Sequence, residues 1–317
     1  MLTSGRMSDA TLAVTGANGF VGRALIRRAS AEGWRVTGLV RSRSGAELVA
    51  RDGGRPHAVG ELETERLVEG LRGARAVVHL AQIGSERDGA SYEHVNVQGT
   101  RRVVGAALAS GVERLVYLSG LGVAHYGMTP PCTNPYFLSK LSAELELFRS
   151  KLEAAVFRPS YILGPESEFL SDLLQQMQHG ELEIVGAGEY RLQPIAVDDA
   201  AAAILAAVTR SGPWPAVFDL VGPEPLALRH LVDRLARAAA AAAPAAHRFS
   251  VRTISLAEAR RAAGSGGYRG LGPDQLDCLV CDETGDPRPL EALLGRFLTP
   301  LDALLANAVR RSAQPRT

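Results

Sequence analysis

The sequence predicts an α/β protein with a doubly wound parallel sheet and a smaller C-terminal region that shapes a substrate site. Short apolar runs alternate with helical patterns from residue 11 to about residue 160, and a glycine-rich turn follows the first run. Beyond residue 160, glycine and proline clusters separate shorter elements. This alternation favours parallel strands that are covered by helices on both faces.

The predicted strands span residues 11–15, 35–40, 56–59, 75–80, 114–118 and 154–158. The helices between them are predicted at residues 20–32, 44–51, 63–71, 91–110 and 136–151. We expect one domain over residues 10–160 and a smaller mixed α/β region over residues 161–317, interleaved with the first. A sheet of this kind binds ligands beyond the carboxyl ends of its strands.

Three further helices are predicted in the C-terminal region. The alanine-rich stretch Ala236–Ala246 continues an apolar stripe and is expected to end at Pro244. A helix over residues 200–208 is expected to have Asp198 as its N-cap and Asp199 in its first turn. After Thr299 as a cap and Pro300 at the first helical position, an apolar stripe predicts a helix that packs on the domain. Its members are Leu301, Leu304, Leu305, Ala308 and Val309.

The composition excludes several classes of function. The chain has 35 basic and 34 acidic residues, with a formal net charge of +1, so no overall field attracts nucleic acid or an anionic membrane. No apolar segment approaches the ~20 residues of a membrane span, and Met1–Asp9 lacks the apolar core of a signal peptide. We expect a cytoplasmic protein without an integral membrane segment that acts on a small molecule and binds no nucleic acid.

The cysteines give little sign of a disulfide framework. Cys132, Cys278 and Cys281 are odd in number, and the Cys278-x-x-Cys281 segment has no second pair or histidine cluster to complete a metal site. We expect a reducing compartment and no bound metal. The two cysteines of this segment are expected to be small apolar side chains, with a redox pair as the alternative.

The turn Gly16-Ala17-Asn18-Gly19-Phe20-Val21-Gly22 joins the first predicted strand to the first helix. Glycines let the backbone bend sharply and approach a ligand without a Cβ atom, and the first N–H groups of the helix attract a phosphate. The turn therefore predicts a site for the pyrophosphate of a dinucleotide, although a glycine-rich surface turn has the same composition. Its binding residues are predicted to be Gly16, Asn18, Gly19, Phe20, Val21 and Gly22.

The second predicted strand ends beside Arg41 and Arg43, where a site that prefers NAD places an acidic residue against the ribose diol. A guanidinium group matches the oxygens of a 2′-phosphate instead. The position of the two arginines, about twenty residues after the glycines, predicts NADP(H) as the preferred cofactor, with NAD(H) as the alternative.

Leu80 and Ala81, after the fourth predicted strand, are expected to let the backbone lie against the adenosine and pyrophosphate. His79 is flanked by the apolar residues of that strand. It is expected to be a hydrogen-bonded core residue without a catalytic role. Asn96 lies in the next helical segment and is expected to give structural support.

Tyr136 and Lys140 are four residues apart and therefore share one face of a predicted helix. A phenol with a reference pKa near ~10 is a poor acid or base at neutral pH, but a neighbouring ammonium group favours its phenolate form. We predict that Tyr136 supplies a proton and that Lys140 lowers its pKa.

These motifs resemble the short-chain dehydrogenase/reductase superfamily over most of the chain. The segments that carry the resemblance are residues 15–22, 79–81, 96–100, 115–122, 136–140 and 158–160. Residues 118–123, 157–165 and 190–199 are similar to an atypical branch, that of the nucleotide-binding accessory subunit of respiratory complex I and its bacterial relatives. The resemblance implies a Rossmann-type NAD(P)-binding fold. It adds Ser119, Lys140 and Pro159 to the cofactor-binding residues, with Lys140 on the nicotinamide ribose.

The sequence departs from the catalytic members at Leu121, which aligns with a serine or threonine that polarises the substrate carbonyl in those members. Leucine cannot donate a hydrogen bond. Five residues of the loop before Tyr136 offer polar groups that could replace it, namely His125, Tyr126, Thr129, Cys132 and Thr133.

The expected function is reduction of a hydrophobic carbonyl or enone-like molecule by an NADPH-dependent oxidoreductase, with Tyr136 as proton donor. A non-catalytic NADPH-binding accessory, sensor or assembly protein is the alternative. A sugar-nucleotide epimerase or dehydratase is disfavoured by Leu121. The resemblance implies that helices 91–110 and 136–151 can form the four-helix interface of a homodimer, as in many relatives, but their pattern is equally compatible with a monomer. A monomer and a larger protein partner stay open.

Overall fold

The computed structural model describes residues 10–212, 216–242, 249–264 and 268–312. The chain folds into two compact units that are built from interleaved segments. Unit 1 contains the chain up to Val123, Pro135–Arg158 and Ala200–Phe218, and unit 2 contains Ala124–Asn134, Pro159–Asp199 and the chain from Asp219 onward. The predicted division at residue 160 stays a prediction.

A seven-stranded sheet forms the centre of unit 1, in the order β11-β6-β5-β4-β1-β2-β3. Neighbours from β6 to β3 pair in parallel, so the predicted doubly wound parallel sheet is confirmed. Each of the six predicted strands matches an observed strand to within one residue at either end. The strands are β1 (Thr11–Thr15), β2 (Arg35–Val40), β3 (Arg55–Ala58), β4 (Ala76–His79), β5 (Arg114–Leu118), β6 (Glu153–Pro159) and β11 (Ala216–Leu220).

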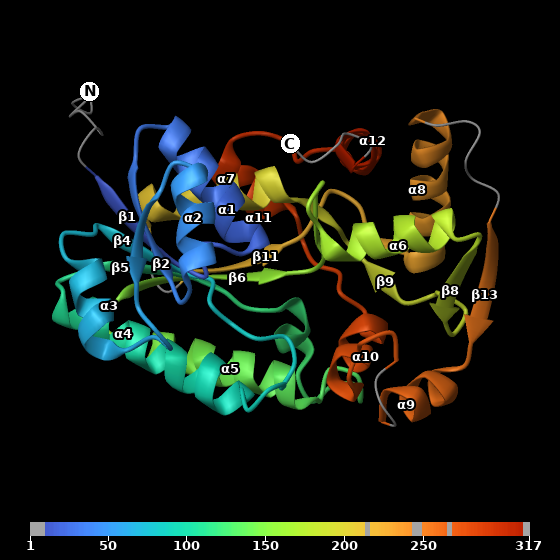
Figure 1. Ribbon diagram of the computed structural model, residues 1–317, viewed down its shortest axis with the longest axis horizontal. Coiled ribbons are helices and arrows are strands. Elements are labelled where there is room, and N and C mark those ends of the chain that lie inside the picture. The colour runs from blue at the N-terminus through green and yellow to red at the C-terminus, as the bar shows by residue number, and fades with distance from the viewer. Residues whose placement is uncertain (1–9, 213–215, 243–248, 265–267, 313–317) are drawn as a thin grey trace. The chain divides into compact units, whose positions relative to one another are not determined.

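Helices cover both faces of this sheet, with α1, α2 and α7 on one face and α3, α4 and α5 on the other (Figure 1). The chain passes from β1 to the neighbouring strands β2 and β4 on its two sides, and this reversal of strand order is where such sheets bind ligands. The helices are α1 (Phe20–Ala31), α2 (Arg43–Arg51), α3 (Thr64–Leu71), α4 (Gly99–Ala109), α5 (Pro135–Phe148) and α7 (Val197–Thr209).

Unit 2 has its own apolar core, in which α8 (Leu228–Ala242) packs against α12 (Leu301–Ser312). The predicted apolar stripe of the last helix is buried there, as expected. The predicted helix end at Pro244 lies outside the described residues. Short strand pairs complete the unit: β7 (Ile162–Leu163) with β10 (Ile195–Ala196), β9 (Arg191–Leu192) with β12 (Leu226–Ala227), and β8 (Glu181–Val185) with β13 (Ser250–Ile254). The other helices are α6 (Glu168–Gln178), α9 (Leu256–Gly264), α10 (Pro273–Val280) and α11 (Arg288–Leu294).

Two predicted caps are wrong by a residue or more. Helix α7 begins at Val197, so Asp198 lies in its first turn and is not the N-cap. The carboxylate of Asp199 accepts hydrogen bonds from Arg296 Nη2 at 2.6 Å and from the backbone N–H of Thr299 at 2.7 Å, and so anchors the C-terminal segment. Helix α12 begins at Leu301, which leaves Pro300 just before the helix.

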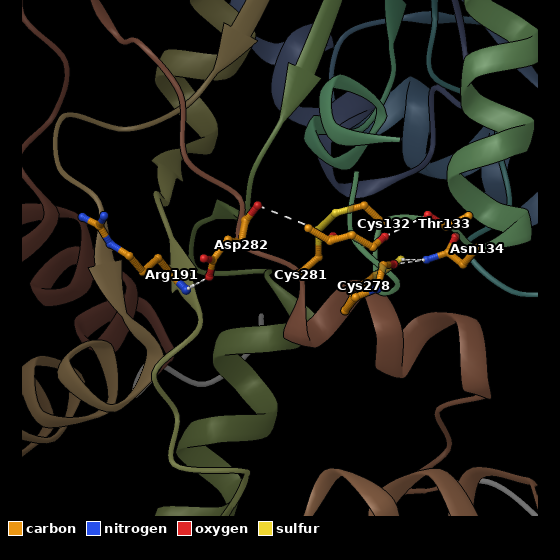
Figure 2. The surroundings of a disulfide bond; sticks show 9 residues. Cys132, Thr133, Asn134, Arg191, Cys278, Cys281 and Asp282 are labelled. Carbon is orange, nitrogen blue, oxygen red and sulfur yellow. Dashed lines mark hydrogen bonds between the residues drawn. A yellow bond between two sulfur atoms is a disulfide. The ribbon is translucent and has the colours of Figure 1, made fainter. Parts of the chain in front are cut away.

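The prediction for the cysteines is wrong for Cys281, which was expected to be an unlinked apolar side chain, and the structure has a disulfide that was not expected. Cys132 and Cys281 are joined by a disulfide bond, and Cys278 is free (Figure 2). The two half-cystines are 149 residues apart in the chain, and the fold of unit 2 brings the loop 124–134 to the end of α10. Sequence spacing gives no sign of such a contact. Because its sulfur is bonded, Cys132 has no S–H group to donate to a substrate.

Candidate active site

The glycine turn forms a tight cradle at the end of β1. Gly16 has a positive φ of 63°, and a Cβ atom placed on it would lie 2.7 Å from the backbone N of Ala81. The N–H of Gly19 donates to the carbonyl oxygen of Gly16 at 3.0 Å, and a Cβ atom on Gly22 would overlap that oxygen. The close packing of the backbone in this turn therefore requires glycine at positions 16 and 22.

Helix α1 starts at Phe20 with Gly19 as its N-cap, and no side chain caps its first turn within the described residues. Its first N–H groups therefore face the cradle and suit an anion. A cavity of about 230 Å³ opens beside the turn, at the carboxyl ends of the strands from β1 to β4. Gly16, Asn18, Arg41 and Ala81 are among its lining residues. The cradle and this cavity fit the pyrophosphate and adenosine of a dinucleotide.

The structure separates the two arginines that were predicted to bind a 2′-phosphate. Arg41 lines the cavity, and its Nη1 atom lies 3.2 Å from a carboxylate oxygen of Glu61. Arg43 is the first residue of α2, is almost fully exposed and pairs at 3.5 Å with Glu47 one helical turn later. Ser42 caps that helix by accepting from the N–H of Gly45. Only Arg41 of the two is therefore directed to the cavity.

Sequence reasoning missed two charged residues of this cavity, Glu61 and Arg102. Arg102 lies on α4, and its Nη2 atom donates to the carbonyl oxygens of His94 at 3.3 Å and of Glu61 at 3.5 Å. Its Nε atom is buried without a partner among the described residues. Nothing in the chain around Arg102 shows that this helix face closes a cavity between strand ends.

His79 is a buried structural residue, as predicted. Its Nδ1 atom accepts from the hydroxyl of Thr15 at 2.7 Å, and its Nε2 atom donates to the hydroxyl of Thr100 at 3.0 Å. Thr15 in turn accepts from the N–H groups of Leu80 and Ala81, and Thr100 donates to the carbonyl oxygen of Asn96. This chain of bonds assigns the neutral ring with its proton on Nε2. Burial lowers the pKa of His79 to about 3, and the charge of Lys140 adds to this effect.

Asn96 explains why the predicted helix 91–110 is not regular. It lies in a π-helical turn, Glu93–Gln98, which precedes α4. Its buried amide accepts from the N–H of Ile83 at 2.9 Å and donates to the carbonyl of Ile83 and to the hydroxyl of Ser139 on α5. The amide therefore joins the segment after β4 to the helix that carries Tyr136, which is the structural role expected.

Lys140 is fully buried on α5, one turn after Tyr136. Its Nζ atom donates to the carbonyl oxygen of Leu118 at 2.7 Å and to the side-chain oxygen of Gln82, and it lies 4.3 Å from the centre of the Tyr117 ring. Burial lowers the pKa of Lys140 to about 7, although Glu144 acts in the opposite direction. The ammonium group is therefore held at the ends of β4 and β5, and it loses its proton near neutral pH.

Tyr136 is half-buried at the start of α5. Its ring contacts Tyr92 edge-on, with 5.8 Å between ring centres, and lies beside Phe137 at 5.3 Å. A Cβ atom on Gly120 would lie 3.8 Å from the Tyr136 ring, and one on Gly122 would overlap the Phe137 ring. The small residues after β5 therefore make room for the first turn of α5.

Ser119 and Leu121 occupy this same segment. The hydroxyl of Ser119 is buried without a hydrogen-bond partner among the described residues, while its N–H donates to Phe157 at 2.7 Å. An orphaned buried hydroxyl of this kind suits a ligand that completes its hydrogen bonds. Leu121 is 1% exposed and begins a 3₁₀ turn, Leu121–His125, so it supplies no donor.

The remaining predicted residues belong to unit 2. Pro159 is the last residue of β6, and the loop residues from His125 to Thr133 precede α5. The hydroxyl of Thr133 is used within that loop, where it donates to the carbonyl oxygen of Thr129 at 2.8 Å. The roles assigned to Pro159, to the loop donors and to Tyr136 and Lys140 stay predictions.

Comparison with known proteins gives a consistent picture. Residues 12–222 match the model of the NAD dependent epimerase/dehydratase family. The chain is 30% identical over 251 residues to a 2-alkyl-3-oxoalkanoate reductase of Stenotrophomonas maltophilia, which covers 72% of this chain and 75% of the relative. It is also 30% identical over 239 residues to a 4-hydroxy-2-methyl-3-oxo-4-farnesyl-3,4-dihydroquinoline-1-oxide ketoreductase of Stigmatella aurantiaca, with 70% of this chain and 71% of the relative covered.

Solved structures share the fold. MoeE5 in complex with UDP-glucose and NAD superposes with a TM-score of 0.74 at 22% identity, over 95% of this chain and 98% of that chain. An NADPH-dependent quinone oxidoreductase of Escherichia coli gives a TM-score of 0.69 at 21% identity, over 93% and 98% of the two chains. These likenesses confirm the Rossmann-type fold. Among the described residues, no helix combines the length and apolar character that crossing a membrane requires.

Proposed function

Because the chain belongs to the NAD-dependent epimerase/dehydratase family, an extended branch of the short-chain dehydrogenase/reductase superfamily, we propose that it is an NADPH-dependent reductase of hydrophobic carbonyl compounds. Tyr136 is the proton donor in this proposal. The observation that carries it is the buried ammonium group of Lys140, one helical turn from Tyr136, which donates to the carbonyl oxygen of Leu118, the last residue of β5. The residue after Leu118 is Ser119, with its orphaned hydroxyl.

In this reaction a bound NADPH supplies the hydride. The protein holds the dinucleotide at the glycine cradle and provides the proton that the reduced carbonyl oxygen takes up. A charged Lys140 favours the phenolate form of a neighbouring phenol, and so assists the release of that proton. The carbonyl of Leu118 and the side chain of Gln82 orient the ammonium group.

The charge pattern of the cavity supports NADPH over NADH. Arg41 projects from the end of β2, where a 2′-phosphate would lie, and the paired donors of a guanidinium suit a phosphate. Arg102 adds a second positive charge to the same cavity. Glu61 already pairs with Arg41, so a bound phosphate would compete with that carboxylate.

The relatives favour a ketone on a long apolar molecule. Two of them are named for oxygenated substrates with alkyl or farnesyl chains, and a ceramide reductase of Caulobacter vibrioides is 32% identical over 196 residues. That last match covers 62% of this chain and 60% of the relative. We therefore propose alkyl 3-oxo compounds as the first substrates to test.

The decisive experiment replaces Tyr136 by Phe and measures both turnover and cofactor binding. Oxidation of NADPH with a panel of alkyl 3-oxo compounds should fall by at least ~100-fold, because general acid catalysis contributes factors of this size. The dissociation constant for NADPH should stay within about twofold, since the cradle is untouched. Full activity in the variant would exclude Tyr136 as the proton donor.

Leu121 is buried and has no hydrogen-bond donor for a substrate carbonyl. This favours a second candidate, an NADPH-binding protein without turnover. In that case the wild type binds NADPH, oxidises it with no compound of the panel and retains a constant partner on purification. Leu121→Ser then supplies the missing hydroxyl. A gain of turnover in this variant would show that the wild type lacks activity because of the leucine. Turnover of a UDP-sugar would instead support an epimerase or dehydratase.

A further inference from the structure

The loop 124–134 connects unit 2 directly to α5, because Pro135 follows Asn134 in the chain and is the first residue of that helix. Most of the loop is exposed, including Met128, which is 74% exposed. Its backbone folds into successive turns, in which Cys132 N–H donates to Thr129 at 3.2 Å and Thr133 N–H donates to Pro130 at 3.0 Å. These bonds are all local, so they do not fix the loop to the rest of unit 2.

Only Cys132 and Asn134 are buried among the eleven residues of this loop, all of which the structure describes. Both contact the same short segment at the end of α10 (Figure 2). Cys132 is bonded to Cys281, and the amide nitrogen of Asn134 lies 3.6 Å from the sulfur of Cys278. The Cys-x-x-Cys segment is therefore the anchor of the loop that leads into Tyr136.

The residues that follow Cys281 are hydrogen-bonded within unit 2. The N–H of Arg191 donates to the carboxylate of Asp282 at 2.6 Å, and the N–H of Glu283 donates to the carbonyl of Arg191 at 2.8 Å. The carbonyl of Glu283 also accepts from the hydroxyl of Ser160 at 3.0 Å. Asp282 and Glu283 follow Cys281 directly in the chain. The disulfide therefore links the loop 124–134 to a segment that is hydrogen-bonded within unit 2.

We propose that the Cys132–Cys281 disulfide is a redox-sensitive tether that positions the loop before Tyr136, so that its reduction lowers turnover and leaves cofactor binding intact. Cofactor binding is spared because the cradle belongs to unit 1 and makes no use of the cysteines. The effect on turnover rests on the proposed function, whereas the effect on the loop does not. A misplacement of a reacting group by about 1 Å can cost ~100-fold in rate.

Reduction of the disulfide requires an external dithiol. A dithiol, either dithiothreitol or a thioredoxin-type protein, gives two electrons and two protons, becomes a disulfide itself and leaves Cys132 and Cys281 as thiols. Both sulfurs belong to residues that are 2% exposed, so the reaction requires local opening of the exposed loop. Burial raises the pKa of the Cys278 thiol, which therefore keeps its proton and does not exchange with the disulfide near neutral pH.

The test begins with the native full-length protein. Alkylation without reductant, carried out after the protein has been denatured and followed by mass spectrometry, should label Cys278 and leave Cys132 and Cys281 linked. Amide hydrogen exchange is then compared before and after dithiothreitol. Exchange of residues 124–134 should rise by roughly tenfold or more on reduction, because a loop without its anchor opens more readily.

Turnover gives the second readout. Reduction should lower kcat by roughly tenfold, with the NADPH dissociation constant within about twofold. Cys278→Ser is the matched control: it removes a thiol but keeps a hydroxyl oxygen that can accept from the Asn134 amide, so it should respond to dithiol as the wild type does. Cys132→Ser should have the reduced rate and no response to dithiol. If this variant does not fold, the reduced wild type supplies the same comparison.

Three free thiols in the native protein would overturn the proposal, as would loop exchange that is identical in the two redox states. If reduction raises the hydrogen exchange of residues 124–134 in a protein that shows no turnover, the disulfide still tethers the loop, and only the proposed reductase activity is rejected. Equal kcat values in the two states of an active enzyme would show that the disulfide does not position Tyr136.

Discussion

The ammonium group of Lys140 donates a hydrogen bond to the carbonyl oxygen of Leu118 at 2.7 Å, in the buried centre of unit 1. This bond holds the cation at the end of β5, one helical turn from Tyr136. Burial lowers the pKa of Lys140 to about 7, and the nearby Glu144 opposes this shift. Lys140 therefore changes its charge near pH 7, whereas a solvated lysine would stay charged at that pH.

We predict that kcat/KM falls as pH rises above about 7, because the free enzyme then loses the charge of Lys140. Lys140→Met should lower kcat by roughly 100-fold and remove this alkaline limb. Lys151, the other lysine of the chain, is exposed and gives the matched control Lys151→Met. An unchanged pH profile in Lys140→Met would mean that another group sets the alkaline limb.

Arg41 should determine the choice between NADPH and NADH. Arg41→Gln removes a charge-assisted hydrogen bond worth ~1.5–3 kcal/mol, so the NADPH dissociation constant should rise by roughly 10- to 100-fold. Glu61 would then face the 2′-phosphate without its partner, which adds repulsion. Binding of NADH should change little. Isothermal titration with both cofactors measures the ratio.

Arg43→Gln is the control for Arg41, because Arg43 is directed to solvent and pairs with Glu47. Its effect on NADPH binding should be no more than about twofold. If Arg43→Gln weakens NADPH binding as strongly as Arg41→Gln, the 2′-phosphate is bound by both arginines and not by Arg41 alone.

Local pattern was sufficient to predict six of the seven strands of the central sheet and the helices between them, because a parallel sheet with βα turns has short-range signals in apolar runs and glycines. The seventh strand, β11, was not predicted. The same signals predicted the structural roles of His79 and Asn96. They did not separate Arg41 from Arg43, since both are basic residues of one loop. Only the start of α2 at Arg43 shows which of them turns away from the cavity.

Long-range contacts account for what the sequence could not show. The disulfide joins residues 149 positions apart, and no spacing rule links a loop cysteine to one of a Cys-x-x-Cys segment. Arg102 reaches the cavity from α4, far in sequence from the glycine turn. Asp198 was predicted as a helix cap, but the helix begins one residue earlier. Asp199 lies in the first turn as predicted, and its carboxylate is bound by Arg296 and Thr299 near the C-terminus.

His79 should make the fold sensitive to acid. Burial lowers its pKa to about 3 in the folded state, against 6.5 for an ordinary histidine, so the unfolded chain binds the extra proton between these values. The free energy of unfolding should therefore fall as pH drops from 6.5 toward 3, by up to ~1.4 kcal/mol per pH unit from this residue.

Urea unfolding of His79→Asn at pH 7 and at pH 4.5 tests this effect. The variant should be less stable at pH 7 by about 2 kcal/mol, because Thr15 and Thr100 lose a buried partner. Its loss of stability between the two pH values should be smaller than that of the wild type. His230→Asn, at an exposed position, should behave as the wild type. Parallel pH slopes for His79→Asn and the wild type would contradict the prediction.

Glu283 should act on stability in the opposite direction. Its carboxyl group is buried in unit 2, and burial raises the pKa of Glu283 to about 8, against 4.5 for an ordinary glutamate. Between these values the folded state holds a proton that the unfolded chain has lost. The free energy of unfolding should therefore decrease as pH rises from 4.5 to 8, by up to ~1.4 kcal/mol per pH unit.

Glu283→Gln keeps the shape of the protonated side chain and cannot ionise, so it should be more stable than the wild type at pH 8 and close to it at pH 4.5. Urea unfolding at these two pH values measures the difference, with the exposed Glu113→Gln as the matched control. The gain at pH 8 arises because folding of the wild type must either bury an ionised carboxylate or bind a proton that the unfolded chain has lost. Either event costs free energy, and glutamine avoids both. A Glu283→Gln variant that loses stability at pH 8 would show instead that the ionised carboxylate is stabilised by its surroundings.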